Sequence, residues 1–310
     1  MNFVLSVDQE ALRDAIRSVC QGRFDMARVR GGFDRSMWDD LAATGVFSLR
    51  ADGFGWADAA VTFEELGAAL VPGPLVWGVL AHALADGVVG GVERGDPDAD
   101  VLVEHLDTLD ALAVLDVDGI ARVEPKELDD AQLLDWPLDP LTPVHRVPEL
   151  PVGDRIADRE TAGEWRRAGA VLTAAYAIGM AQACTEKATS YALEREQFGR
   201  PIGSFQAVKH MLADMAVRVE VARAAVHSAA VMLDDPTIGD VGRAVAGAKL
   251  LAGEAALHNA KTSLQVHGGM GFTWEVDVHL YVKRAWVLDT VFGSGDAHAD
   301  AVAETLSGAG

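Results

Sequence analysis

Cysteine is scarce in this 310-residue sequence, which has only Cys20 and Cys184, far apart along the chain. So few cysteines, without metal-type spacing, indicate a reducing compartment and no zinc site. His267, His279 and His298 also lack the spacing of metal ligands, and we expect them on the surface or at helix ends. The sequence therefore predicts no bound metal.

Basic residues are outnumbered: 26 Lys and Arg stand against 47 Asp and Glu, for a net charge of −21. A solvated acidic surface repels phosphate, which argues against nucleic acid or an anionic membrane as partner. The N-terminus carries Asp8 and Glu10 instead of a basic and apolar leader, and the apolar run 171–180 stops at Gln182. With half of its residues hydrophobic, the chain is expected to be a globular cytoplasmic protein without a membrane partner.

Catalytic signatures are missing too, since the sequence contains no Gly-x-Ser-x-Gly elbow and no evident Cys–His pairing. Apolar residues instead recur every three or four positions, which predicts a mainly α-helical protein. We expect N-terminal helices over 7–22, 35–49, 57–70 and 75–85, and C-terminal helices over 161–194, 204–233, 239–267, 275–290 and 296–306. Long helices joined by short loops favour an antiparallel four-helix bundle.

Between the helical regions lies a short β region. Apolar blocks at 101–103, 111–115 and 120–123 predict strands, and Asp118-Gly119 between the last two is typical of a hairpin turn. Pro-rich loops are expected from 125 to 151. We predict three domains: an N-terminal helical domain (1–93), an abbreviated β domain (94–160) and a C-terminal helical bundle (161–310).

The stretch 195–206 reads Arg-Glu-Gln-Phe-Gly-Arg-Pro-Ile-Gly-Ser-Phe-Gln and separates two of these helices. Its glycines and proline forbid a continuous helix, and Ser204 is a good N-cap for the helix that follows. The turn presents an arginine, two amides and a phenylalanine beside free helix N–H groups, which suits an anionic, partly aromatic ligand such as a dinucleotide. An ordinary inter-helix turn is the alternative.

A second glycine-rich segment, Gly268-Gly269-Met270-Gly271, ends the predicted helix 239–267. Backbone without Cβ atoms lets a ligand approach closely. A helix that simply terminates at glycine is the alternative. We expect Lys283-Arg284, farther along the chain, to lie on a solvated helix face.

Both segments resemble signatures of the flavin-dependent acyl-CoA dehydrogenases. Residues 191–202, Tyr-Ala-Leu-Glu-Arg-Glu-Gln-Phe-Gly-Arg-Pro-Ile, are followed by Phe-Gln-Ala-Val-Lys-His at 205–210, and residues 265–272 resemble the family's Gln-x-x-Gly-Gly-x-Gly-Phe. Phe-Glu-Glu-Leu-Gly at 63–67 and the Trp38, Leu41 and Gly45 pattern extend the resemblance over nearly the whole chain. The family's order of helical domain, β domain and helical bundle agrees with the domain order predicted above from the periodicity of apolar residues.

The resemblance implies an FAD shared between two subunits, with the bundle of one subunit over the pyrophosphate and adenosine. Arg195 would pair with the pyrophosphate. The remaining residues implied to line the cofactor are Gln197, Phe198, Ile202, Gln206, Gln265, Val266, Gly268 and Gly269.

Departures from the family pattern are equally informative. The β domain is short, and neither segment that holds the flavin ring in the family is recognisable. The position of the usual catalytic glutamate is occupied by Phe292 or Gly293, and the alternative position on the first bundle helix falls on Gly169 and Ala170. The resemblance therefore implies no catalytic base in this chain.

A chain with half a flavin site and no base resembles the short subunit of the heteromeric (α2β2) acyl-CoA dehydrogenases of actinobacterial steroid catabolism. This implies α,β-desaturation of a bulky acyl-CoA, a longer partner chain that supplies the base, and electron-transferring flavoprotein as acceptor. One alternative is a flavin-free structural or regulatory subunit. Another is a homo-oligomer with an unrecognised base, for which Asp296 and Glu275 are the nearest acids.

Overall fold

The computed structural model describes residues 5–95 and 99–307, which form two compact units. Unit 1 contains residues up to 26, 56–71 and 170 onward, and unit 2 contains 27–55 and 72–169. The predicted mainly helical fold is confirmed. The predicted boundaries at 93/94 and 160/161 remain a prediction.

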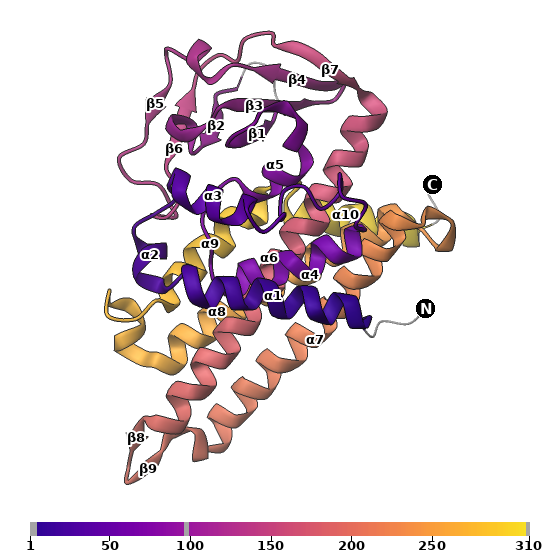
Figure 1. The fold of residues 1–310 in the computed structure, drawn as a ribbon. Helices are drawn as coiled ribbons and strands as arrows, with labels where there is room; N and C mark the ends of the chain where they lie inside the picture. The colour runs from indigo at the N-terminus through magenta and orange to yellow at the C-terminus, as the bar shows by residue number, and fades with distance from the viewer. Residues whose placement is uncertain (1–4, 96–98, 308–310) are drawn as a thin grey trace. The chain divides into compact units, whose positions relative to one another are not determined.

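Unit 1 is helical (Figure 1). Its bundle helices coincide with the predicted ones to within three residues, because the apolar period of a bundle helix is unambiguous over long segments. The helices are α1 (Val7–Arg23), α4 (Trp56–Ala68), α6 (Arg159–Glu194, from 170 onward in this unit), α7 (Gln206–Asp234), α8 (Val241–His267), α9 (Val278–Thr290) and α10 (Gly295–Leu306).

Side-chain caps fix where several of these helices begin. Ser6 accepts from the Gln9 N–H, and the Gln9 side chain accepts from the Ser6 N–H, so α1 begins with a capping box. Asp240 caps α8 by accepting from the Arg243 N–H at 3.0 Å. The prediction that Ser204 caps α7 is wrong: the N-cap is Phe205, which has no side-chain acceptor, because Ser204 belongs to the short 3₁₀ turn η4 (Ile202–Ser204).

Helices α4 and α6 approach each other so closely that only glycine fits at their crossing. An added Cβ on Gly67 would lie 1.9 Å from the Tyr176 carbonyl oxygen, and one on Gly179 would lie 1.8 Å from the Glu64 carbonyl oxygen. Both distances are far inside van der Waals contact. This crossing fixes α4 against the bundle.

Helix α6 is long and apolar enough to cross a membrane by length and composition, and 89% of its most apolar window is buried inside the protein. The apolar part of this helix is therefore longer than the run 171–180 that was expected from the sequence. Every residue from 170 to 181 is buried.

Unit 2 contains two small sheets and short helices. In the first sheet, of order β1-β3-β4-β7, β1 pairs with β3 in parallel and the other pairs are antiparallel. The predicted β3–β4 hairpin is present, but its two-residue loop is Val117-Asp118, one residue before the predicted Asp118-Gly119, because Gly119 already pairs with Asp116 as the first residue of β4. The second sheet, of order β2-β6-β5, is antiparallel. The strands are β1 (Val89–Glu93), β2 (Val101–Glu104), β3 (Ala111–Asp116), β4 (Gly119–Val123), β5 (Gln132–Leu133), β6 (Val144–Val147) and β7 (Asp154–Asp158), and the helices are α2 (Met26–Arg30), α3 (Arg35–Ala42) and α5 (Leu75–Leu80).

Several expectations for this unit are wrong. Helix α3 ends at Ala42 and α5 at Leu80, several residues before the predicted ends. β1 lies at the end of the stretch 1–93, for which only helices were expected, and β5 and β6 lie within the predicted Pro-rich loops. Strand pairing from distant segments stabilises these elements, and local sequence does not reveal it.

Candidate functional site

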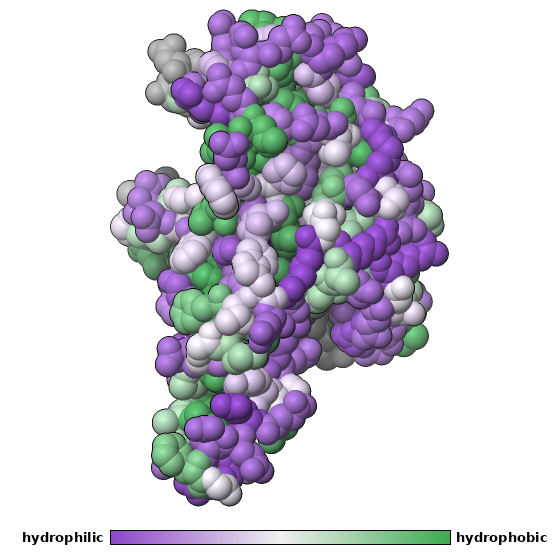
Figure 2. All heavy atoms as spheres, turned by 90° about the vertical axis from the view of Figure 1, so that its left-hand side faces the viewer, coloured by the Kyte–Doolittle hydropathy of each residue, from purple (hydrophilic) through white to green (hydrophobic). Residues whose placement is uncertain are grey.

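The predicted turn 195–206 forms the tip of the α6–α7 helical hairpin, labelled β8 and β9 in Figure 1. β8 (Glu196–Gln197) pairs with β9 (Arg200–Pro201), and the Arg195 carbonyl accepts from the Ile202 N–H at 2.7 Å. Phe198 and Gly199 turn the chain with φ of 55° and 77°. Figure 2 shows this tip at the bottom of its view, where hydrophobic and hydrophilic side chains mix.

Several side chains of this turn are exposed to solvent. Phe198 is 92% exposed, although phenylalanine is normally buried. Arg195 is exposed, and among the residues that the structure describes its guanidinium has no hydrogen-bond or ion-pair partner. Gln197 and Gln206 are exposed and Ile202 is half-buried. The turn therefore offers a cation, amides and an aromatic ring to a ligand.

The second predicted segment lies where α8 ends. Gln265, Gly268 and Gly269 are exposed, whereas Val266 is 8% exposed and has little side-chain surface to offer. Gly268 adopts φ 61° and ψ −140°, which glycine alone adopts readily, and its N–H caps the Gln265 carbonyl. A Cβ added at Gly268 or Gly269 would meet no atom within 4 Å, so this backbone faces open space.

Bundle packing brings both segments to the same end of unit 1. The buried Asn259 of α8 donates to the Met215 carbonyl of α7 at 3.0 Å and to Thr185 Oγ1 of α6 at 3.2 Å. From these contacts α8 runs on to Gln265, α6 runs on to Arg195, and α7 runs back to Gln206. The two segments that the sequence singled out are therefore spatial neighbours.

This end of the bundle fits one half of a dinucleotide. An exposed guanidinium suits a pyrophosphate, exposed backbone without Cβ atoms allows close approach, and an exposed ring suits stacking or apolar contact. Amide side chains add donors and acceptors for ribose and adenine. These groups fit the pyrophosphate and adenosine portion of FAD.

The segment after α9, where the resemblance places the missing base, is a tightly held turn. The buried Lys249 donates from Nζ to the carbonyls of Leu288 at 2.8 Å and Gly293 at 3.2 Å. His298 Nε2 donates to the Phe292 carbonyl at 2.9 Å. Burial lowers the pKa of His298, and the nearby Lys249 ammonium lowers it further.

No acid occupies the implied base positions. Phe292 is 3% exposed, Gly169 and Ala170 are buried, and none of the three has an ionisable side chain. Asp296 and Glu275, the nearest acids by sequence, are both exposed. A general base normally needs a pKa tuned by burial or by neighbouring charge, and exposure favours neither.

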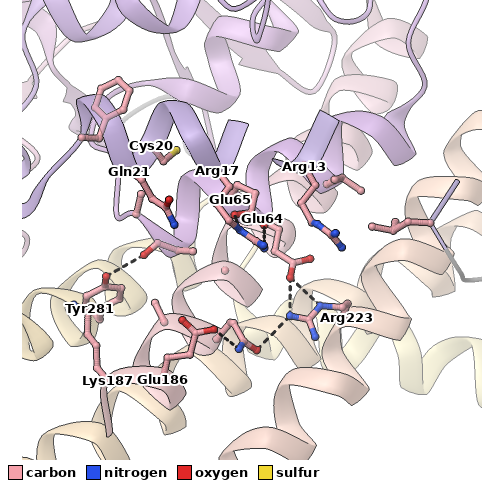
Figure 3. A pocket seen from close by; sticks show the side chains of 18 of the residues that line it. Arg13, Arg17, Cys20, Gln21, Glu64, Glu65, Glu186, Lys187, Arg223 and Tyr281 are labelled. Atoms are coloured by element: carbon pink, nitrogen blue, oxygen red, sulfur yellow. Dashed lines mark hydrogen bonds and ion pairs between the residues drawn. The ribbon is translucent and has the colours of Figure 1, made fainter. Parts of the chain in front are cut away.

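A cleft of about 1050 Å³ lies elsewhere in unit 1, between α1, α4, α6 and α7 (Figure 3). Its walls carry charges of both signs. Arg17 binds Glu65 through two bonds of 2.7 and 2.9 Å, and Arg223 binds Glu64 at 2.6 and 2.8 Å. None of the predicted cofactor residues lines this cleft.

Ion pairing stabilises the charged walls of this cleft. Burial alone raises the pKa of Glu64, but hydrogen bonds and charges from His227 and Arg223 outweigh it and leave the pKa below 4.5. Cys20 also lines the cleft, and burial raises its pKa to about 12, so its thiol is protonated at neutral pH. The cleft therefore shows paired charges that join α1 and α4 to the bundle, and no activated nucleophile.

The sequence did not reveal these ion pairs, because their partners lie far apart along the chain and no local pattern marks them. The prediction that Arg284 lies on a solvated helix face is wrong: Arg284 is 5% exposed and donates to the Tyr176 hydroxyl at 3.2 Å. His267 and His279 lie at helix ends, which is one of the two expected placements, as the last residue of α8 and the second residue of α9, and each is 8% exposed. No local pattern marks the contact between Tyr176 and Arg284, because the two residues lie on different helices, far apart along the chain.

The fold is that of the acyl-CoA dehydrogenases. Residues 167–307 match the family model of the acyl-CoA dehydrogenase C-terminal domain. The chain is 35% identical over 302 residues to acyl-CoA dehydrogenase IpdE2 of Mycobacterium tuberculosis, covering 90% of this chain and 91% of the relative. The chain therefore belongs to the acyl-CoA dehydrogenase family, and the predicted enzyme class is confirmed.

Solved structures share the fold at low sequence identity. The ChsE4–ChsE5 complex from Mycobacterium tuberculosis superposes with a TM-score of 0.80 at 21% identity, covering 99% of each chain. A variant of the Tcur3481–Tcur3483 steroid acyl-CoA dehydrogenase superposes with a TM-score of 0.82 at 21% identity, covering 97% of this chain and 98% of that one. Each of these structures is named after two proteins.

Proposed function

We propose that this chain is the short subunit of a heteromeric acyl-CoA dehydrogenase that desaturates a bulky, steroid-type acyl-CoA between its α and β carbons. The chain contributes the pyrophosphate and adenosine half of an interfacial FAD site, and a longer paralogue contributes the flavin-ring half and the base. The observation that carries this proposal is the pairing of a free, ligand-ready bundle end with base positions that hold only Phe292, Gly293, Gly169 and Ala170.

The roles of this chain's own residues follow from their chemistry. When bound, the flavin of this family accepts the β-hydride of the acyl-CoA. Arg195 holds the pyrophosphate by charge-assisted bonds, and the Gly268-Gly269 backbone allows the cofactor close approach. Phe198 and Gln197 cover the adenosine side. Proton abstraction at the α carbon is left to the partner, since no side chain at the base positions can take a proton.

Heteromeric assembly is supported by the similar structures, each of which is named after two proteins, and the steroid class is supported by the one that is named a steroid acyl-CoA dehydrogenase. The FAD site at the interface rests on the residues of this chain. Electron-transferring flavoprotein would accept the electrons, and the assembly would be α2β2 and cytoplasmic.

Co-purification tests the proposal. We expect the tagged chain, expressed with the product of the neighbouring gene, to yield a yellow complex with one FAD for each pair of chains. Expressed alone, the chain should bind no stoichiometric FAD and show no dehydrogenase activity. A yellow, active preparation of the chain alone would refute the heteromer. Two flavins per pair would show a complete second cradle, and an active complex whose flavin needs no residue of this chain would favour the flavin-free structural subunit.

A further inference from the structure

An aromatic pair joins the two halves of the proposed cofactor site. Tyr191, in the last turn of α6, stacks on His267, the last residue of α8, with ring centroids 4.3 Å apart and planes 25° apart. His267 is 8% exposed and Tyr191 is half-buried, so water is largely kept from the stack. Offset aromatic stacking of this kind stabilises beyond area burial alone.

Hydrogen bonds fix both partners of the pair. His267 Nδ1 donates to the Ser263 carbonyl at 2.7 Å, which sets the tautomer and holds the ring against α8. The Tyr191 carbonyl accepts from the Arg195 N–H at 2.8 Å, and the Arg195 carbonyl in turn accepts from the Ile202 N–H. The ring of Tyr191 is thus held by α8, while its backbone begins the turn that presents Arg195.

His267 has the same relation to the glycine segment after α8 that Tyr191 has to the arginine turn. It directly precedes Gly268, and the Gly268 N–H caps the Gln265 carbonyl. Moving the His267 ring would therefore move the start of the glycine backbone, just as moving Tyr191 would move Arg195. Neither ring belongs to the set expected to touch the cofactor.

We propose that the Tyr191–His267 stack is a positioning pair that holds the arginine turn and the glycine backbone at the spacing one pyrophosphate needs. The proposal rests on the proposed function and adds two residues to it. Without the stack, the two segments would still be present but would spend less time at the productive spacing. An aromatic pair contributes a factor of about two to ten in an equilibrium constant, which sets the expected loss of FAD affinity.

The test uses the complex with its partner chain. Tyr191→Leu removes the ring but keeps an apolar side chain, and Tyr191→Phe keeps the stack. We expect Tyr191→Leu to raise the dissociation constant of FAD about two- to tenfold and to alter the circular dichroism of the bound flavin, and Tyr191→Phe to change neither by more than about twofold. Val226→Ala, at a fully buried position of α7, is the control for a general loss of packing.

His267→Asn provides a second route if the leucine variant does not assemble. An amide can still donate to the Ser263 carbonyl but cannot stack, so the same loss of FAD affinity is expected. Normal FAD affinity and an unchanged flavin spectrum in an assembled Tyr191→Leu or His267→Asn complex would overturn the positioning role. A loss of equal size in Val226→Ala at matched thermal stability would overturn it as well.

Arg195→Ala separates this inference from the proposed function. If Arg195→Ala loses flavin while the stack variants retain it, the positioning role alone is wrong. If Arg195→Ala also retains flavin like the parent, the proposed cofactor site itself is wrong.

Discussion

Replacing Arg195 by alanine probes the proposed site most directly, because the change should affect FAD binding and leave the folded chain itself nearly unaffected. The guanidinium is exposed and has no partner among the described residues, so its removal breaks no internal bond. Surface changes of this kind usually alter the free energy of unfolding by less than about 0.5 kcal/mol. Any loss of FAD affinity then reports the contact with FAD itself.

The expected size follows from the chemistry of the contact. A charge-assisted hydrogen bond to phosphate contributes about 1.5–3 kcal/mol, which corresponds to about ten- to a hundredfold in affinity. Arg195→Lys should recover only part of this, because the ammonium lacks the planar fork that binds two oxygens together. Arg200→Ala is the matched control, since Arg200 lies in the same turn but stacks over the Phe205 ring at 4.2 Å.

Equilibrium dialysis of the complex against FAD, followed by absorbance, measures the affinity, and gel filtration measures subunit association. We expect Arg195→Ala to lose flavin while the subunits stay together, and Arg200→Ala to retain both properties. An alanine variant that holds flavin like the parent would make Arg195 an ordinary turn residue. An Arg195→Ala variant that falls apart into subunits would place the arginine in assembly instead.

Three further predictions follow from other residues. The pKa of Glu64 lies below its ordinary 4.5, so the contribution of Glu64 to stability is present above about pH 4.5 and is lost as the pH falls through the lower pKa of the folded state. The midpoint of thermal unfolding should therefore vary less between pH 5 and pH 3 in Glu64→Gln than in the parent, and an equal dependence on pH in both proteins would contradict this. Gly179→Ala should lower the midpoint of thermal unfolding by several degrees, because overpacking costs about 1–3 kcal/mol. Gly247→Ala is the control: a Cβ there meets nothing within 4 Å, so the midpoint should stay unchanged or rise slightly. Asp296→Asn and Glu275→Gln should each leave turnover of the complex within a fewfold, because loss of a true base costs about 10²–10⁴-fold; a thousandfold drop with flavin retained would make this chain catalytic.

The bundle could be predicted closely from sequence because its helices are long and their apolar period is clear. α8 was expected over 239–267 and runs over Val241–His267. β1 was missed because Val-Gly-Gly-Val-Glu carries two glycines, which weaken any strand pattern, and its pairing with β3 is supplied by a segment some twenty residues on. β7 was missed because its sequence, Asp-Arg-Ile-Ala-Asp, is mostly polar and exposed.

For the candidate site, the sequence indicated the residue types but not their physical state. The composition of 195–206 suggested a ligand-binding turn, while the freedom of Arg195 and the exposure of Phe198 became visible only in the structure. Val266 was grouped with its exposed neighbours although its side chain faces inward. The sequence of a motif does not show which of its residues are buried, because burial depends on the helices that pack against it.

The turn after α9, which Lys249 and His298 hold by hydrogen bonds, also affects whether a base could be introduced at position 292 by mutation. A glutamate at 292 would place a carboxylate where a phenylalanine ring is now 3% exposed, and burying such a charge without a partner costs several kcal/mol. The nearby Lys249 ammonium already donates to backbone carbonyls, so pairing with the glutamate carboxylate would break those hydrogen bonds. A single substitution at 292 should thus destabilise the turn, seen as a lower unfolding midpoint, before it could create a proton acceptor. In the proposed heteromer, this chain would therefore stay dependent on its partner for the base.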